Sequence, residues 1–453
     1  MESLFARLAL LPEGWRENVR IGLAADGTIT DVETGSEAVA DEGVGLLMPG
    51  FSNVHSHAFQ RALAGRAEVA GDSDDSFWTW RDLMYRLADR LTPKDLTSIS
   101  RLLYVEMLEA GYTAVGEFHY LHHDPAGELY EEPIAMSLAL AHAAAEAGIS
   151  LALLPVLYRY SDFGARPPEP AQRRFSTTPE QFVAMVHRLR DRLDDCIVGV
   201  AFHSLRAVDV GSMRDVIAAL GQHPGFPIHV HVAEQAREVE ACLQMCGHRP
   251  VEMLLLEDLP DENWCLIHAT HINDAELRGI AASGAVAGLC PTTEANLGDG
   301  IFPLRSFLQC EGRFAIGSDS HVSLDPFEEL RWLEYAQRLK SGKRLRAVTG
   351  NGRHAGFELV RSAAVNGAAA LSLNAGQIAP GQRANLLVLD PNAALVDTVG
   401  ENNILDALVF APRRAPVDSV MVDGRWVLRQ GRHPLRDLAV AEYRACCERL
   451  RLA

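Results

Sequence analysis

The rest of the chain can be interpreted from residues 48–57, which read Met48-Pro49-Gly50-Phe51-Ser52-Asn53-Val54-His55-Ser56-His57. An apolar run bounded by proline and glycine leads into two histidines, which predicts a buried strand that ends at a loop. Residues two apart on a strand point to the same side, so His55 and His57 should project together. Two such imidazoles can bind one divalent transition metal. A polar strand end with two incidental histidines is the alternative, and further ligands downstream decide between them.

Eight apolar segments beyond residue 49 alternate with longer amphipathic segments such as Leu96–Ala110 and Pro179–Arg192. The predicted strands are Gly50–His57, Thr113–His119, Leu151–Leu157, Ile197–His203, Pro227–Val232, Trp264–Ala269, Ala285–Cys290 and Phe314–Ser318. Eight strands with helices between them are typical of a parallel (β/α)8 barrel, whose active site lies at the carboxyl ends of the strands. The sequence therefore predicts an α/β protein built on a TIM-like barrel.

The two ends of the chain have a different pattern of short strands. Asp26-Gly27 and Asp423-Gly424 each separate two short apolar segments, which is a strong signal for a β-hairpin. The simplest interpretation is a small β-sandwich domain built from both chain ends, with the barrel inserted between them. The predicted parts are residues 1–47, the barrel over residues 48–374, and residues 375–453 with a terminal helix over Leu435–Leu452.

Further histidine and acidic residues stand at the ends of the fifth, sixth and eighth predicted strands. These ends read Ile228-His229-Val230-His231-Val232-Ala233-Glu234, Ile267-His268-Ala269-Thr270-His271 and Gly317-Ser318-Asp319. Because the carboxyl ends of barrel strands meet at one face, these side chains should surround the same site as the first pair. Three histidines and one aspartate give the nitrogen and oxygen ligands expected for Zn²⁺, with a position left open for water. The fifth strand offers two candidates, His229 and His231.

The order His-x-His, His-x-x-Glu, His and Ser-Asp resembles the amidohydrolase superfamily, and specifically its mononuclear deaminase branch. Pro49-Gly50-Phe51 and Gly376…Gly381…Asn385-Leu386 are similar to that family's chain layout, so the resemblance covers nearly the whole chain. The family's His-x-x-Glu motif selects His231 over His229, which is then a buried, hydrogen-bonded histidine. The implied metal ligands are His55, His57, His231 and Asp319.

The expected cofactor is one Zn²⁺ per chain. Many dinuclear members of the superfamily bridge two metals with a carbamylated lysine, and no lysine occurs between Lys94 and Lys340. A lysine bridge from strands two to eight is therefore impossible, although this argument leaves a carboxylate bridge open. One metal is the simpler interpretation.

The resemblance also implies catalytic roles for Glu234, His268 and Asp319. A bound Zn²⁺ lowers the pKa of its water to roughly 7, and Asp319 can accept the proton of that water. Glu234 is placed to protonate the substrate nitrogen and to pass a proton to departing ammonia. His268 is expected to stabilise the tetrahedral intermediate, whereas His271 belongs to the turn that follows the strand.

Three further segments most resemble the N-formimino-L-glutamate deiminases of histidine breakdown. They are Phe77-Trp78-Thr79-Trp80-Arg81, Gly116-Glu117-Phe118-His119-Tyr120 and His203-Ser204-Leu205-Arg206-Ala207-Val208. The resemblance implies substrate contacts by Gln60, Arg81, Tyr120, His203 and Arg206. A dicarboxylate needs paired cations, and arginine binds a carboxylate through two N–H groups, although which arginine holds which carboxylate stays open. The aromatic segment around Trp78 could cover the barrel mouth.

The function implied is metal-dependent hydrolysis of N-formimino-L-glutamate to N-formyl-L-glutamate and ammonia. The alternative is a deaminase of an aromatic base such as guanine, which shares the metal site but needs ring stacking and amide contacts in place of two arginines. A catalytically inactive scaffold is a third hypothesis. Such a protein should have lost metal ligands, and this sequence retains all of them.

Composition limits the partners and the compartment. A formal net charge of −18 argues against nucleic-acid and anionic-membrane binding, because both need a basic surface. Eight scattered cysteines indicate reduced thiols, and no signal peptide or long apolar window is evident, so a soluble cytoplasmic protein is expected. Cys242 and Cys246 with His248 resemble a metal cluster, but the spacing equally places the thiols on one helix face, which we favour. We expect a homodimer that acts on a small dicarboxylate.

Overall fold

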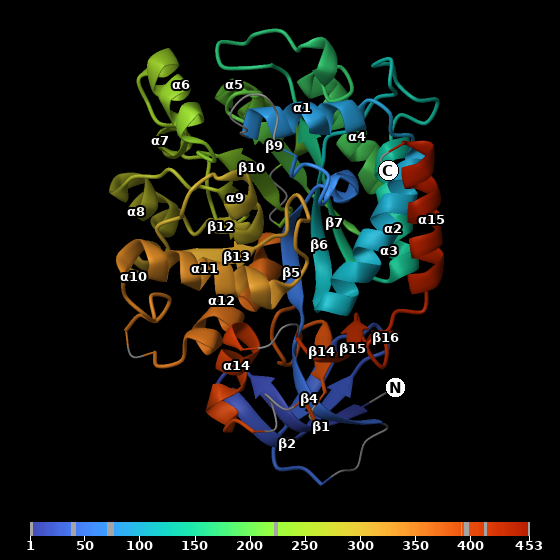
Figure 1. Cartoon of the computed structure of the whole chain (residues 1–453), viewed down its shortest axis with the longest axis vertical. Coiled ribbons are helices and arrows are strands. Elements are labelled where there is room, and N and C mark those ends of the chain that lie inside the picture. Colours follow the sequence, from blue (N-terminus) through green and yellow to red (C-terminus); the bar gives the residue numbers. More distant parts are fainter. Residues whose placement is uncertain are drawn as a thin grey trace.

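A barrel of parallel strands occupies the centre of the molecule, and a separate sheet lies at one end of it (Figure 1). The computed structural model describes residues 3–37, 42–69, 77–221, 225–350, 352–390, 392–393, 398–411 and 415–451. The barrel strands are β5 (Phe51–Ser56), β6 (Tyr112–His119), β7 (Ser150–Leu157), β8 (Ile197–Val198), β9 (Val200–Ser204), β10 (Ile228–Val232), β11 (Trp264–His268), β12 (Val286–Leu289) and β13 (Arg313–Ile316). All eight predicted strands are confirmed, the fourth being divided at Gly199 into β8 and β9.

The barrel closes between its first and last strands at the predicted metal ligands. The backbone N–H of Asp319 donates to the carbonyl of His55 at 3.0 Å, and the N–H of His57 donates to the carbonyl of Asp319 at 3.2 Å. These two hydrogen bonds therefore fix the backbone of three predicted ligands, His55, His57 and Asp319.

Helices surround the barrel, as the amphipathic segments predict (Figure 1). They are α1 (Phe77–Ala88), α2 (Pro93–Ala110), α3 (Ala135–Ala147), α4 (Pro179–Arg192), α5 (Val210–Leu220), α6 (Ala236–Cys246), α7 (Pro250–Leu256), α8 (Asp274–Ser283), α9 (Pro291–Leu297), α10 (Leu304–Gln309), α11 (Pro326–Ser341) and α12 (Ala355–Ala370). Short 3-10 turns are η1 (Ala58–Leu63) and η2 (Pro170–Gln172). The side chains of Thr92, Thr178 and Asp325 accept backbone N–H groups at helix starts, and each precedes a proline that suits the first helical position.

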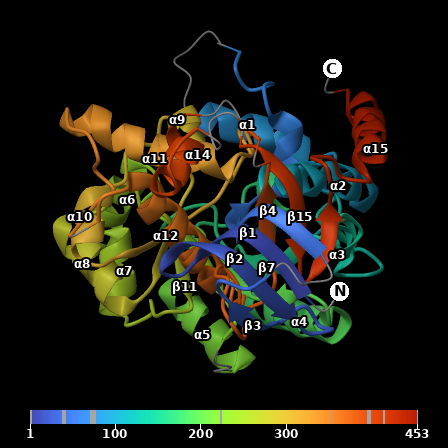
Figure 2. The same cartoon turned by 90° about the horizontal axis from the view of Figure 1, so that it is seen from below.

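The two chain ends build one small β unit, as predicted. Its strands are β1 (Ser3–Leu11), β2 (Gly14–Leu23), β3 (Ile29–Glu33), β4 (Glu42–Pro49), β14 (Leu386–Leu389), β15 (Val417–Val422) and β16 (Arg425–Leu428). They form a continuous seven-stranded sheet in the order β16-β15-β14-β4-β1-β2-β3, with its own apolar core, seen from below in Figure 2. Both predicted hairpins are present as β2–β3 and β15–β16. The boundaries of the domains stay predictions.

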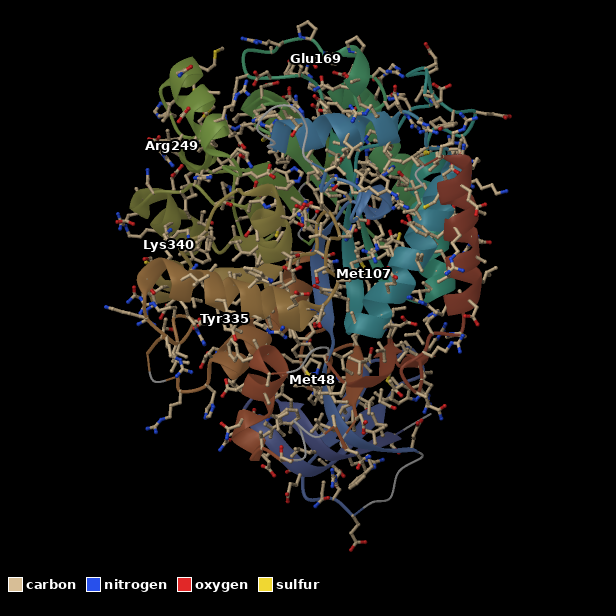
Figure 3. The ribbon with its side chains drawn as sticks, in the orientation of Figure 1. Met48, Met107, Glu169, Arg249, Tyr335 and Lys340 are labelled. Atoms are coloured by element: carbon tan, nitrogen blue, oxygen red, sulfur yellow. The ribbon has the colours of Figure 1, made fainter. Side chains whose placement is uncertain are left out.

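Gly50 joins this sheet to the barrel, between β4 and β5. A Cβ atom at Gly50 would lie 2.2 Å from Cγ2 of Thr113 on β6, so glycine allows the chain to pass this close to β6. Met48, labelled in Figure 3, lies on β4 just before this junction. The connection holds the small sheet against the end of the barrel opposite the metal ligands.

The last segment of the chain returns to the barrel. The helix α15 (Arg436–Arg449) packs along α2, where Arg449 pairs with Asp95. Residues 401–410 form η3 (Glu401–Asn403) and α14 (Ile404–Phe410). Among the helices of the described residues, none is both long and apolar enough to cross a membrane.

All eight cysteines are free thiols. Cys242 and Cys246 lie on one face of α6 with their Sγ atoms 3.8 Å apart, which confirms the helical interpretation of their spacing.

Candidate metal centre and active site

The four predicted ligands meet at the carboxyl ends of β5, β10 and β13. Nε2 of His55 lies 3.0 Å from Nε2 of His231 and 3.4 Å from Oδ1 of Asp319. Nε2 of His57 lies 3.4 Å from the same Asp319 oxygen. All four side chains are buried. The fold therefore brings residues that are up to 264 positions apart in sequence, from His55 to Asp319, into one cluster.

Hydrogen bonds to backbone carbonyls fix the orientation of two of these imidazoles. Nδ1 of His57 donates to the carbonyl of Phe118 at 2.9 Å, and Nδ1 of His231 donates to the carbonyl of His203 at 2.8 Å. A carbonyl only accepts, so the proton of each ring resides on Nδ1 and the lone pair of Nε2 faces the centre. Burial lowers the pKa of His55, His57 and His231, which keeps the neutral form that binds metals.

This donor set fits a divalent cation. Lone pairs that face one another beside a buried carboxylate oxygen repel unless a cation lies between them. Zinc bonds to nitrogen and oxygen of about 2.0–2.2 Å place neighbouring donors about 3.0–3.5 Å apart. The observed separations of 3.0 and 3.4 Å lie in that range.

His229 is turned away from this cluster. Its Nε2 donates to the carbonyl of Ala370 at the end of α12, 2.9 Å away, and burial lowers its pKa to about 4. It is absent from the groups of described residues whose donor atoms lie close enough to hold a metal. The sequence predicts that His229 is buried and hydrogen-bonded, and the carbonyl of Ala370 is its hydrogen-bond partner.

Substitution of the two histidines on β10 should separate their roles. His231→Asn is expected to lose most of the bound metal, whereas His229→Asn should retain about one ion per chain, because only His231 offers a free lone pair to the centre. Elemental analysis of both proteins, purified in parallel and checked by thermal unfolding, measures this. Loss of metal from His229→Asn with retention in His231→Asn, or two ions per chain in the wild type, would contradict the assignment.

Glu234 and His268 lie beside the metal ligands and can exchange protons with a substrate. Nε2 of His268 is 3.7 Å from Oε1 of Glu234 and 3.7 Å from Oδ2 of Asp319. Burial raises the pKa of Glu234 to about 7, so its carboxyl can hold a proton near neutrality. Burial opposes the charged form of His268, but Glu234, Glu294 and Asp319 outweigh it and raise the pKa of His268 to about 10.

The backbone is strained at the strand ends that carry these groups. Ala233, His268 and Asp319 have positive φ angles of 51°, 68° and 46°, which non-glycine residues rarely adopt. Strain of this kind costs of order 1–3 kcal/mol per residue and collects at functional sites, where it aims side chains. These residues stand at the ends of β10, β11 and β13, and two of these ends, those of β10 and β13, also carry predicted metal ligands.

Glu117 supports the first two ligands, and sequence reasoning did not single it out for this. Its carboxylate accepts hydrogen bonds from Ser56 Oγ at 2.6 Å, from the Ala58 N–H at 2.6 Å and from the Tyr104 hydroxyl at 3.2 Å. These bonds hold the backbone on both sides of His57. An acidic residue inside the apolar strand 113–119 was the available signal, because a buried carboxylate requires specific donors.

Two more acidic residues reach the site from α9 and the loop that follows it. Oε1 of Glu294 lies 3.3 Å from Nδ1 of His268 and accepts the N–H of Cys290 at 2.9 Å. Asp299 lies with Glu234 and His268 in one buried group, and burial raises its pKa to about 9. No sequence pattern pointed to either residue, since only the path of the chain after β12 brings them to His268.

A cavity opens above the metal ligands and contains every predicted substrate contact. The predicted contacts that line it are Gln60 on η1, Arg81 on α1, Tyr120 after β6, His203 on β9 and Arg206 after β9. The predicted ligands His57, His231 and Asp319 line the same cavity. Nε2 of Gln60 donates to the Tyr120 hydroxyl at 3.0 Å. The helix α1 lies across this end of the barrel, so the aromatic segment does cover the mouth (Figure 1).

The two arginines of the cavity have unused donors. Arg206 is buried, and its contact with Glu238 is long at 3.9 Å. The guanidinium of Arg81 lies 4.6 Å from the ring centre of Trp78 and 5.4 Å from that of Tyr85. Within the described residues, Nε of both arginines is buried without a hydrogen-bond partner. Buried donors without partners are rare, so the cavity is suited to an anionic ligand.

The sequence matches two family models that together span most of the chain. The model of the amidohydrolase family matches residues 46–427. The model of the N-terminal domain of formimidoylglutamate deiminase HutF matches residues 1–45.

Curated relatives and solved structures agree with these matches. The chain is 49% identical over 436 residues to a formimidoylglutamate deiminase of Pseudomonas aeruginosa, covering 96% of each chain. It is 28% identical to a 5-methylthioadenosine/S-adenosylhomocysteine deaminase of Halobacterium salinarum, covering 92% of this chain and 89% of the relative. The crystal structure of an amidohydrolase from Brucella melitensis superposes with a TM-score of 0.94 at 44% identity, covering 99% of this chain and all of the other.

Proposed function

The chain belongs to the amidohydrolase family, and we propose that it hydrolyses N-formimino-L-glutamate to N-formyl-L-glutamate and ammonia in histidine degradation. It is a hydrolase that acts on C–N bonds other than peptide bonds. The observation that carries the choice of substrate is the pairing of one metal centre with two arginines, Arg81 and Arg206, in a single cavity. A substrate with two carboxylates and one amidine matches that combination.

We propose one Zn²⁺ per chain, held by His55, His57, His231 and Asp319. When bound, such an ion lowers the pKa of its water towards 7 and polarises the group under attack. Asp319 also stands beside His268, so the carboxylate can accept the proton of the attacking water and pass it on.

The remaining residues bind and orient the substrate. Arg81 and Arg206 hold the two carboxylates through paired N–H groups. The wall of the cavity between these arginines and the metal ligands is formed by Gln60, Tyr120 and His203. This placement holds the imino carbon at the metal site in one orientation. Fixed orientation of this kind supplies a large part of the rate acceleration by an enzyme.

Glu234 and His268 complete the proton transfers. Water oxygen adds to the imino carbon and the C=N bond becomes a single bond, with Glu234 delivering a proton to that nitrogen. His268, as a cation, stabilises the developing charge. Collapse of the tetrahedral carbon to a formyl group then breaks the C–N bond to that nitrogen. The nitrogen leaves as ammonia with the proton that Asp319 had accepted, and the hydroxyl proton of the tetrahedral carbon returns to Glu234.

Product analysis tests the proposed function and shows which of the two C–N bonds at the imino carbon is cleaved. The zinc-loaded protein should convert N-formimino-L-glutamate to equal amounts of N-formyl-L-glutamate and ammonia, followed by proton NMR and an ammonia assay. Glutamate with formamide as products would show that the other nitrogen is protonated, and absence of turnover would refute the function.

The homodimer predicted from the sequence stays a prediction, which light scattering can test.

A further inference from the structure

Three arginine side chains surround the indole of Trp78 at the barrel mouth. The guanidinium carbons of Arg81 and Arg237 each lie 4.6 Å from the centre of the Trp78 ring, and that of Arg206 lies 6.0 Å from it. The three come from different elements: α1, the segment after β9 and the first turn of α6. Arg237 is exposed and lies outside the cavity lining, so it forms the outermost member of this arginine cluster.

Among the residues that the structure describes, the arginine cluster has one ion pair for its three guanidinium groups, and that pair is long. In the part of the chain that the structure describes, neither Arg81 nor Arg237 forms an ion pair, and Arg206 has only the 3.9 Å contact with Glu238. Ordinary pairs of 2.7 Å occur at Arg188–Glu132, Arg249–Glu276 and Arg383–Asp423. The chain has 60 acidic residues against 42 basic ones, yet two of these three adjacent cations, Arg81 and Arg237, have no ion pair among the described residues. This arrangement needs a reason, because like charges repel.

The charge of Arg237 does not stabilise α6, the helix on which it lies. Arg237 is the second residue of α6 (Ala236–Cys246), and a cation in the first turn opposes the helix dipole. Stacking on an indole holds a guanidinium through its face and leaves its N–H edge free for an anion. The charge of Arg237 therefore opposes the dipole of α6, while its stacking on Trp78 presents the guanidinium to a carboxylate from solvent.

We infer that Arg237 is a further substrate-binding residue, which captures a carboxylate of the incoming dicarboxylate at the rim, outside the inner pair Arg81 and Arg206. This rests on the proposed function. Cations at the mouth of a cavity focus the electric field and raise the association rate of an anionic ligand, and the effect weakens with ionic strength. Arg237 thereby also selects carboxylate-bearing substrates over substrates without one.

The test compares Arg237→Met and Arg237→Lys with Arg7→Met. Arg7 is an exposed residue on β1, in the sheet at the opposite end of the molecule, so its loss changes net charge equally and leaves the mouth intact. At low ionic strength, Arg237→Met should raise KM for N-formimino-L-glutamate about five- to tenfold with little change in kcat, as loss of a rim charge slows association. The salt dependence of kcat/KM should become shallower, and Arg237→Lys should restore most of it.

Formamidine, an amidine without carboxylates, separates binding from folding. Its kcat/KM should not fall in Arg237→Met. Equal kinetics of Arg237→Met and Arg7→Met at low ionic strength would overturn the inference, and so would a parallel loss with formamidine. Both results require a wild type that hydrolyses N-formimino-L-glutamate, and failure of the wild type itself refutes the proposed function instead.

Discussion

Glu234→Gln is expected to lower kcat by about 10² or more while bound metal stays near its wild-type content. The amide keeps the size of the side chain but cannot donate a carboxyl proton to the substrate nitrogen. Its partner His268, 3.7 Å away, remains in place, so the protein should fold and bind substrate. Steady-state ammonia release and elemental analysis of the same preparation measure the two quantities.

Glu240→Gln is the matched control for this change, because Glu240 is an exposed glutamate on α6, the helix that begins two residues after Glu234. The kcat and the metal content of Glu240→Gln should equal those of the wild type. Near-normal turnover of Glu234→Gln would show that Glu234 does not shuttle the proton, and His268 would become the better candidate.

Arg206→Met should reduce kcat/KM for N-formimino-L-glutamate by roughly 2–4 kcal/mol, or about 30- to 1,000-fold. The guanidinium is buried in the cavity, so its removal leaves a substrate carboxylate without a partner. Lysine at this position should rescue only part of the loss, since an ammonium supplies charge without the planar pair of donors. Initial rates over a range of substrate concentrations give the comparison.

Formamidine again distinguishes binding from folding. It has no carboxylate, so Arg206→Met should barely alter its hydrolysis. Arg214→Met, which removes an exposed arginine paired with Glu257 on the barrel surface, serves as the charge-matched control. A parallel fall with both substrates would exclude a carboxylate-binding role for Arg206 and strengthen the aromatic-base alternative.

The barrel and the cluster of metal-ligand candidates could be predicted because both depend on local patterns. Alternating apolar and amphipathic segments mark the strands and helices, and the carboxyl ends of parallel strands share one face. Histidines and acids at those ends therefore had to meet. The hairpins at Asp26-Gly27 and Asp423-Gly424 follow from turn chemistry alone.

The supporting residues could not be predicted because their contacts are non-local. Glu294 and Asp299 approach His268 only through the path of the chain after β12. The separation of His229 from the centre depends on a carbonyl of Ala370, 141 residues away. Trp78 was noted for its aromatic character, but the convergence of Arg237 on it depends on how α1 lies across the mouth.

The substrate preference of the zinc-loaded wild-type protein distinguishes a formiminoglutamate hydrolase from a deaminase of an aromatic base. The measurement is kcat/KM for ammonia release from N-formimino-L-glutamate beside guanine and cytosine, at one metal content and one pH. The two arginines in the cavity predict rapid release from N-formimino-L-glutamate and little from either base. Guanine or cytosine as the preferred substrate would contradict the account, because a neutral ring makes no use of Arg81 and Arg206.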